Sequence, residues 1–156
     1  MIILGIDPSL TGTGIAILKD GKLIESKTLL NKLKDIPRIK FIVDEIINYC
    51  DIHKPDFIGI EGYAYGRANK ATVLGELSGV IKYILEEKGL TYTIVAPMAV
   101  KKFVTGKGNA HKELVLMKVL KVYGIEFDDN NKADAFVIAK YIESLQEKFK
   151  NEGVDL

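Results

Sequence analysis

The alternation of apolar and polar residues along this 156-residue chain predicts five strands separated by helices. Short apolar or β-prone runs are typical of strands, and they cover residues 2–6, 14–19, 22–29, 57–60 and 91–95. Asp20-Gly21 lies between the second and third runs, and both residues tolerate the positive φ angles of a type I′ turn. We therefore expect three antiparallel strands at the N-terminus, followed by two further strands.

Apolar residues that recur every three or four positions predict the helices. One begins near Pro37, which is tolerated in a first turn, and its apolar face includes residues from Ile36 to Cys50. Further helices are predicted over 73–85, 97–103 (a short one), about 112–123 and about 132–148. The long elements follow the order β-β-β-α-β-α-β-α-α. This order predicts an α/β fold with a mixed five-stranded sheet, in which an antiparallel meander adjoins parallel strands and helices flank the sheet.

Composition restricts the class of protein more than it identifies a function. The length fits one domain, which we place at residues 1–149 with a polar tail at 150–156. Hydrophobic residues make up 47% of the chain, which excludes an intrinsically disordered protein. Cys50 is the only cysteine, so we expect a reducing, cytoplasmic location. No apolar run reaches the roughly 18 residues of a membrane span.

Three carboxylates stand at the ends of otherwise apolar segments. Asp7 and Glu61 each end a strand, and parallel neighbours would bring both to the sheet edge where ligands bind in α/β folds. Asp134 opens a helix between small residues that suit close packing. Converging carboxylates repel unless a divalent cation lies between them, and oxygen ligands suit Mg²⁺ or Mn²⁺. The alternatives are a turn cap for Asp7 and favourable helix electrostatics for Asp134.

Positive charge is concentrated locally, although the net charge of the chain is only +1. Four lysines flank a glycine-containing loop and a helix start, where they could bind phosphates: Lys101, Lys102, Lys107 and Lys112. A second basic and aromatic cluster follows Glu61 and consists of Tyr63, Tyr65, Arg67 and Lys70. Its tyrosines could stack on nucleic-acid bases, or they could close the loop against the core.

From Ile2 to about Ile142 the chain resembles the RuvC-like Holliday junction resolvases, within the RNase H-like group of nucleases and transferases. Four motifs in order carry the resemblance: Ile3-Leu4-Gly5-Ile6-Asp7-Pro8 with Thr11-Gly12 and Gly14; Pro55-Asp56 through Ile60-Glu61; Ala96-Pro97 with Val100-Lys101-Lys102 and the 106–112 loop; and Ala133-Asp134-Ala135 with Ile138-Ala139. Each motif alone is weakly specific, but the four at fitting spacing are strongly so.

The resemblance implies an RNase H-like fold and a Mg²⁺-dependent endonuclease that acts as a homodimer on four-way DNA junctions. Paired nicks with 5′-phosphate and 3′-hydroxyl ends would then serve DNA recombination and repair at the nucleoid. By position, Asp7, Glu61 and Asp134 would hold the metal, with two ions per site and Mn²⁺ as a substitute. Lys112 would lie near the scissile phosphate, while Lys101 or Lys102 would bind the DNA backbone.

Three details of the family pattern are open in this chain. The family usually has an acidic or histidine ligand three residues before the last Asp, where this chain has Asn131, with Asp128 or Asp129 as alternatives. Either Tyr63 or Tyr65 could be the aromatic residue that probes the junction. The second long helix is our predicted dimer interface, through Val73, Leu77, Val80 and Ile84, with Gly75 and Gly79 allowing close approach; the alternative is that this face packs on the sheet.

Three other functions share parts of this pattern. A sugar-kinase-like or actin-like phosphotransferase has a similar first strand and turn, but it needs a second domain to enclose a nucleotide. An RNase H-like nuclease acting on structured RNA would keep the carboxylates without requiring four-way geometry. A catalytically weak nucleic-acid-binding relative is disfavoured because Asp7, Glu61 and Asp134 are all present.

Overall fold

The computed structural model describes the backbone of residues 1–62 and 68–153, and the side chains of residues 1–62 and 74–153. The elements are β1 (Ile2–Asp7), β2 (Thr13–Lys19), β3 (Lys22–Leu29), α1 (Asp35–His53), β4 (Phe57–Glu61), α2 (Ala68–Glu87), β5 (Tyr92–Val95), α3 (Pro97–Thr105), α4 (Lys112–Tyr123) and α5 (Asn130–Glu152).

The strands form one mixed sheet in the order β3-β2-β1-β4-β5. β1, β2 and β3 are antiparallel, whereas β4 is parallel to β1 and β5 is parallel to β4. Asp20 and Gly21 both have positive φ, 49° and 77°, which confirms the predicted turn between β2 and β3. The predicted mixed sheet is therefore confirmed, with all five strands in the expected directions.

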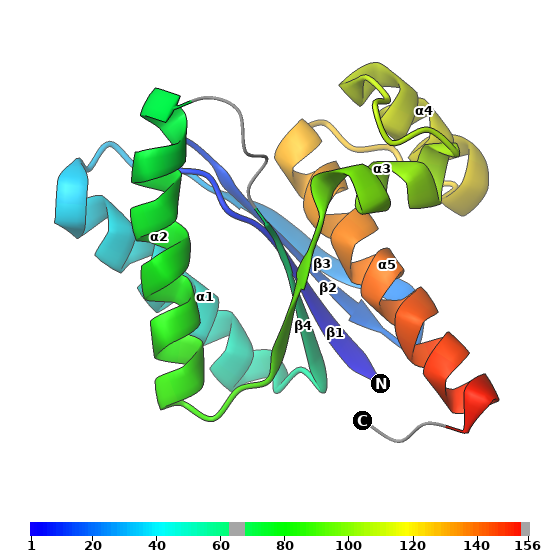
Figure 1. The fold of residues 1–156 in the computed structure, drawn as a ribbon, viewed down its shortest axis with the longest axis horizontal. Helices are drawn as coiled ribbons and strands as arrows, with labels where there is room; N and C mark the ends of the chain where they lie inside the picture. Colours follow the sequence, from blue (N-terminus) through cyan, green and yellow to red (C-terminus); the bar gives the residue numbers. More distant parts are fainter. Residues whose placement is uncertain (63–67, 154–156) are drawn as a thin grey trace.

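Helices cover both faces of the sheet (Figure 1). α1 and α2 lie on one face, where large aliphatic side chains such as Ile42, Leu77 and Ile81 join those of the strands in a buried core. α5 lies on the other face with α3 and α4 beside it, around the fully buried Phe136. The ring of Phe136 contacts Tyr123 edge-on, with their centroids 5.2 Å apart.

α5 approaches the sheet closely because glycines leave room for its backbone. A Cβ atom added to Gly5 of β1 would stand 2.1 Å from the carbonyl oxygen of Ala135, and one added to Gly14 of β2 would stand 2.0 Å from that of Asn131. Any side chain at these two positions would force the helix away from the sheet. The start of α5 is therefore fixed against the ends of β1 and β2.

The structure corrects the predicted helices in two places. α1 begins at Asp35 and α5 continues to Glu152, so both are longer than the periodicity indicated. Ile36 was assigned to the apolar face of α1, but it is 68% exposed because it precedes the turn at which α1 first contacts the core, where Ile39 is buried.

The predicted interface on α2 is also partly wrong. Leu77 is completely buried inside the protein, and Val80 and Ile84 pack against the same core. The outward face of α2 instead presents Gly75 and Gly79, around which a Cβ would find open space. The side chain of Val73 lies outside the described residues.

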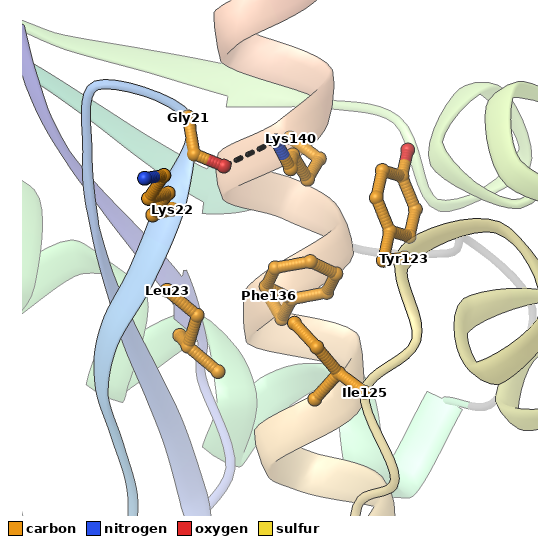
Figure 2. Close-up of a pocket in the computed structure, with 7 residues that line it drawn as sticks. All are labelled: Gly21, Lys22, Leu23, Tyr123, Ile125, Phe136 and Lys140. Atoms are coloured by element: carbon orange, nitrogen blue, oxygen red, sulfur yellow. Dashed lines mark hydrogen bonds between the residues drawn. The ribbon is translucent and has the colours of Figure 1, made fainter.

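A hollow of about 280 Å³ separates the β2–β3 turn from α5 (Figure 2). The Lys140 ammonium lies in it, donates to the Gly21 carbonyl at 2.7 Å, and pairs with Glu143 at 2.8 Å. It also lies 5.3 Å from the centre of the Tyr123 ring. Lys140 thus links the β2–β3 turn to α5. This link lies at the end of the sheet where β1 begins, away from Asp7 at the other end of that strand.

Cys50 is a free, buried cysteine, and burial raises the pKa of its thiol to about 12. No helix within the described part of the chain combines the length and apolar character needed to cross a membrane.

Candidate active site

Asp7 and Glu61 lie side by side because β1 and β4 are parallel and in register. Ile6 pairs with Ile60, so the next residue of each strand, Asp7 and Glu61, reaches the same edge of the sheet. Both strands are buried up to that point and become partly exposed at the carboxylates. The sequence prediction that these two strand ends converge is confirmed by this register.

Asp134 joins them from the α5 side of the sheet. It occupies the second turn of α5, between the fully buried Ala133 and Ala135, and its own side chain is 25% exposed. The close approach of α5 at Gly5 and Gly14 sets its depth over the end of β1. The small neighbours that the sequence analysis identified therefore have the packing role expected of them.

Burial raises the pKa of all three carboxyl groups, and the negative charge of Asp134 further raises the pKa values of Asp7 and Glu61. Burial, followed by the negative charges of Glu61 and Asp134, holds the pKa of Asp7 well above its usual range. Burial and the charge of Asp134 raise the pKa of Glu61 to about 7. Burial also raises the pKa of Asp134. A shared hydrogen bond links Asp7 and Glu61, as expected when one of two adjacent carboxyl groups keeps its proton.

Two lysines oppose this negative charge. Lys112 opens α4 and places its Nζ 3.8 Å from Oδ2 of Asp134. Lys101, on α3, lowers the pKa values of both Glu61 and Asp134. The sequence does not distinguish Lys101 from Lys102, but the structure does, because Lys101 is partly buried beside the carboxylates whereas Lys102 is exposed.

The donor set fits a hard divalent cation in its chemistry. Carboxylate oxygens from three separate elements converge, and burial raises the pKa of each of these carboxyl groups. Among the described side chains, no three acidic, histidine or cysteine residues are close enough together to hold an ion as they stand. Lys112 instead supplies positive charge next to Asp134.

A polar network that the sequence analysis did not predict positions the start of α5. Asp129 accepts a hydrogen bond from the Asn131 backbone at 2.7 Å, which caps the helix, and another from the Thr28 hydroxyl at 2.5 Å. Asp129 thereby connects the end of β3 to the helix that carries Asp134. The sequence signal was an Asp directly before a helix, but it was considered only as an alternative ligand.

The other candidate residues for the fourth ligand have different surroundings. The side-chain nitrogen of Asn131 lies 2.9 Å from the place where a Cβ on Gly12 would stand, in the turn after Asp7. Asp128 is exposed and pairs with Lys132 at 3.0 Å. The ligand role of Asn131 stays a prediction.

The remaining predicted DNA contacts fall into two groups. Lys107 lies exposed on the loop between α3 and α4, as expected for a phosphate contact. The side chains of Tyr63, Tyr65, Arg67 and Lys70 lie outside the described residues.

Comparisons with known proteins identify the family. Residues 3–141 match the family model described as crossover junction endodeoxyribonuclease RuvC. Proteins of that name are 33% identical over 150 residues in Chloroherpeton thalassium, covering 89% of this chain and 80% of the relative, and 28% identical in Mycobacterium leprae, covering 89% and 79%.

Solved structures show the same fold. Thermus thermophilus RuvC matches with a TM-score of 0.77 at 23% identity, covering 94% of this chain and 97% of that one. The fowlpox virus resolvase, solved with Holliday junction DNA, matches with a TM-score of 0.64 at 17% identity, covering 93% and 99%. The predicted resemblance is confirmed, and this chain belongs to the RuvC family of crossover junction endodeoxyribonucleases.

Proposed function

We propose that this chain cuts four-way DNA junctions by Mg²⁺-dependent phosphodiester hydrolysis, with Asp7, Glu61 and Asp134 as the metal ligands. The observation that carries the proposal is the convergence of these three carboxylates at one sheet edge, each with a raised pKa, in a chain of the RuvC family. We further propose two ions per site, replacement by Mn²⁺, and action on DNA in the cytoplasm.

The proposed site residues have two roles: some would hold the metal ions, and Lys112 would stabilise negative charge on the phosphate. Bound divalent ions would supply an activated water and stabilise the leaving oxygen. Asp7, Glu61 and Asp134 would hold them from three separate elements, and the amide oxygen of Asn131 would add an uncharged ligand. Lys112 lies close enough to Asp134 to meet the scissile phosphate, where a fixed positive charge stabilises charge that develops in the transition state.

The four-way substrate and the homodimer are proposed together. A Thermus thermophilus RuvC and a fowlpox virus resolvase of the same fold were each solved with Holliday junction DNA. One chain has one cluster of three carboxylates among its described residues, so two symmetric nicks need two chains. The outward face of α2, with Gly75, Gly79 and the 60%-exposed Tyr83, is the surface we propose for the dimer.

A substrate panel with a matched variant tests the proposal. Four-way junction, duplex, flap and single-stranded RNA substrates are incubated with and without Mg²⁺, and junction affinity is measured in Ca²⁺. We expect paired nicks, with 5′-phosphate and 3′-hydroxyl ends, in junctions only. Asp7→Asn should remove cleavage and keep junction binding, because it changes metal ligation without changing the basic surface.

Two results would contradict the proposal. Cleavage by Asp7→Asn at the wild-type rate would mean that the metal site is assigned to the wrong residues. A preference for structured RNA over every DNA substrate would replace the junction with an RNA target. Light scattering at micromolar concentration tests the dimer separately, since a monomer that still cuts junctions symmetrically would exclude it.

A further inference from the structure

Positive charge in this protein is gathered into two segments. Residues 27–40 and 96–123 hold 11 of the 22 basic residues but only Asp35 and Glu113 of the 21 acidic ones. The rest of the chain carries the other 11 basic residues against 19 acidic residues, and so has a net charge of −8. The second segment contains the lysines beside the carboxylates, whereas the basic residues of the first have no role in the site described above.

The 27–40 segment reaches the same edge of the sheet as the carboxylates. Asp7 pairs with Gly14 of β2, and Gly14 pairs with Thr28 of β3. Two strand spacings therefore separate Asp7 from Thr28, a distance of about 10 Å, over which duplex DNA presents about six phosphates. The chain then leaves β3 and forms the connection to α1 at this edge.

The two basic segments lie on opposite sides of the carboxylates. α1 belongs to one face of the sheet and the α3–α4 pair to the other (Figure 1). DNA that crosses the sheet edge at Asp7 and contacts Lys101 and Lys112 on one side continues towards the start of α1 on the other. A contact on both sides would hold the scissile strand over the carboxylates.

The side chains of the β3–α1 connection are free to make such a contact. Lys27 pairs with Glu45 and Lys40 pairs with Asp44, so these two cations are already neutralised within the protein. Lys32 and Lys34 are exposed, and no carboxylate among the described side chains lies within ion-pair distance of either. Arg38 uses its Nε to donate to the Leu33 carbonyl at 2.6 Å, which braces the connection.

We propose, on the basis of the proposed junction cleavage, that the β3–α1 connection is a second DNA-binding surface, with Lys32 and Lys34 bound to phosphates of the junction arm that leaves the active site away from α3 and α4. Exposed Leu30 and Ile36, each 68% accessible, flank the two lysines and would lie along the sugar edge of the groove. A two-fold contact of this segment with its own copy is disfavoured, because it would bring like charges together.

The test compares two double variants that remove the same charge. Lys32→Ala with Lys34→Ala alters the proposed surface, while Lys88→Ala with Lys150→Ala removes two exposed lysines at the opposite edge of the sheet, where α2 and α5 end. Junction affinity is measured in Ca²⁺ across a salt series. We expect the first variant to lower the slope of log affinity against log salt by about 1.8, because each lost phosphate contact removes roughly 0.9.

Two further measurements identify the ligand. Hydroxyl-radical footprinting of the junction should lose protection along one arm in the Lys32→Ala, Lys34→Ala variant only, while the Lys88→Ala, Lys150→Ala variant keeps the wild-type footprint. Light scattering should give the wild-type mass for both variants. A variant that becomes monomeric would show that this surface joins two copies of the chain, and would overturn the proposal.

The two proposals can fail separately. If the wild-type protein neither binds nor cuts junctions, the proposed function is wrong. If it does both, and the two double variants show the same affinity, salt slope and footprint, then only the second DNA surface is wrong.

Discussion

The two faces of the sheet are packed in opposite ways. On the α1–α2 face, large side chains such as Ile42, Leu77 and Ile81 fill the space between helices and strands. On the α5 face the helix backbone almost touches the strands, because Gly5 and Gly14 have no side chains to separate them. One face supplies buried apolar volume, while the other fixes a helix position.

This difference bears on the positions of the proposed active-site residues. Asp134 and Lys112 both belong to the α5 side of the molecule, and Asp7 and Glu61 end the two strands between the faces. A helix held by backbone contact has little freedom to slide, so the Asp134 carboxylate keeps a fixed height over Asp7. The aliphatic face instead supports the strands through side-chain packing.

Among the variants that test this comparison, we expect the largest effect, a loss of cleavage rate, from the substitution of Lys112. Lys112→Ala should slow single-turnover cleavage by about 10²–10³-fold at saturating enzyme, the loss typical of removing one group that stabilises transition-state charge. Lys102→Ala, on the exposed surface of α3, should weaken junction affinity in Ca²⁺ and leave that rate nearly unchanged. If the Lys112→Ala variant cuts normally when it is fully bound to the junction, then Lys112 only contacts the DNA backbone and has no catalytic role.

Paired substitutions on the two faces come next. Leu77→Ala should lower the free energy of unfolding by about 2–5 kcal/mol through a cavity. Gly5→Ala should lower it by about 1–3 kcal/mol or more, because the new Cβ would meet the Ala135 carbonyl. Only Gly5→Ala should also slow cleavage per folded molecule, which urea titration and single-turnover rates can separate. If both variants cleave at the same rate per folded molecule, the distinction drawn between the two faces is wrong.

The pH dependence of stability tests the carboxylates directly. Because folding raises the pKa of Glu61 from 4.5 to about 7, its contribution to metal-free stability is present below pH 4.5 and is lost as the pH rises through about 7. Asp7 acts in the same direction. We expect the Tm in EDTA to fall by a few degrees over this window, at about 2–4 °C per kcal/mol.

Matched samples sharpen that measurement. Glu61→Gln should flatten the pH profile, and added Mg²⁺ should restore the wild-type Tm at pH 8 but not that of the variant. A wild-type profile that is already flat in EDTA would show that folding does not raise the pKa values of these carboxyl groups.

The smallest effect belongs to the cap of α5. Asp129→Ala should lower the free energy of unfolding by about 1 kcal/mol, the usual value for a lost N-cap. It should also raise the Mg²⁺ concentration needed for half-maximal cleavage, because Thr28 would no longer hold the helix start. Asp128→Ala, which removes an exposed carboxylate one residue earlier, is the control and should change neither quantity.

The sequence was sufficient to predict the sheet and to identify the three candidate carboxylates, because both follow from short-range patterns of apolar and polar residues. Strand ends at Asp7 and Glu61 follow from apolar runs, and their convergence follows from the parallel order of the strands. The turn at Asp20-Gly21 follows from residues that accept positive φ.

Other features depend on contacts between distant segments and could not be predicted in this way. Thr28 and Asp129 are 101 residues apart, and no local sequence pattern around either residue predicts their contact. Lys101 and Lys102 are neighbours in the sequence, and only the direction of α3 brings one of them near the carboxylates. The apolar face of α2 has the same periodicity whether it covers the sheet or a second chain, which is why Leu77 was assigned to the dimer.

The close contact of α5 with β1 and β2 also has a consequence for folding during synthesis of the chain. During synthesis β1, β2 and β3 emerge first, and β3 ends at Leu29, whereas the helix that covers their second face, α5, begins only at Asn130. Until then Ile3, Ala16 and Leu18 lack their cover, and Asp7 and Glu61 lack Asp134. A nascent chain therefore exposes apolar strand surface, and under the proposed metal ligation it gains nuclease activity only when α5 has packed against the strands.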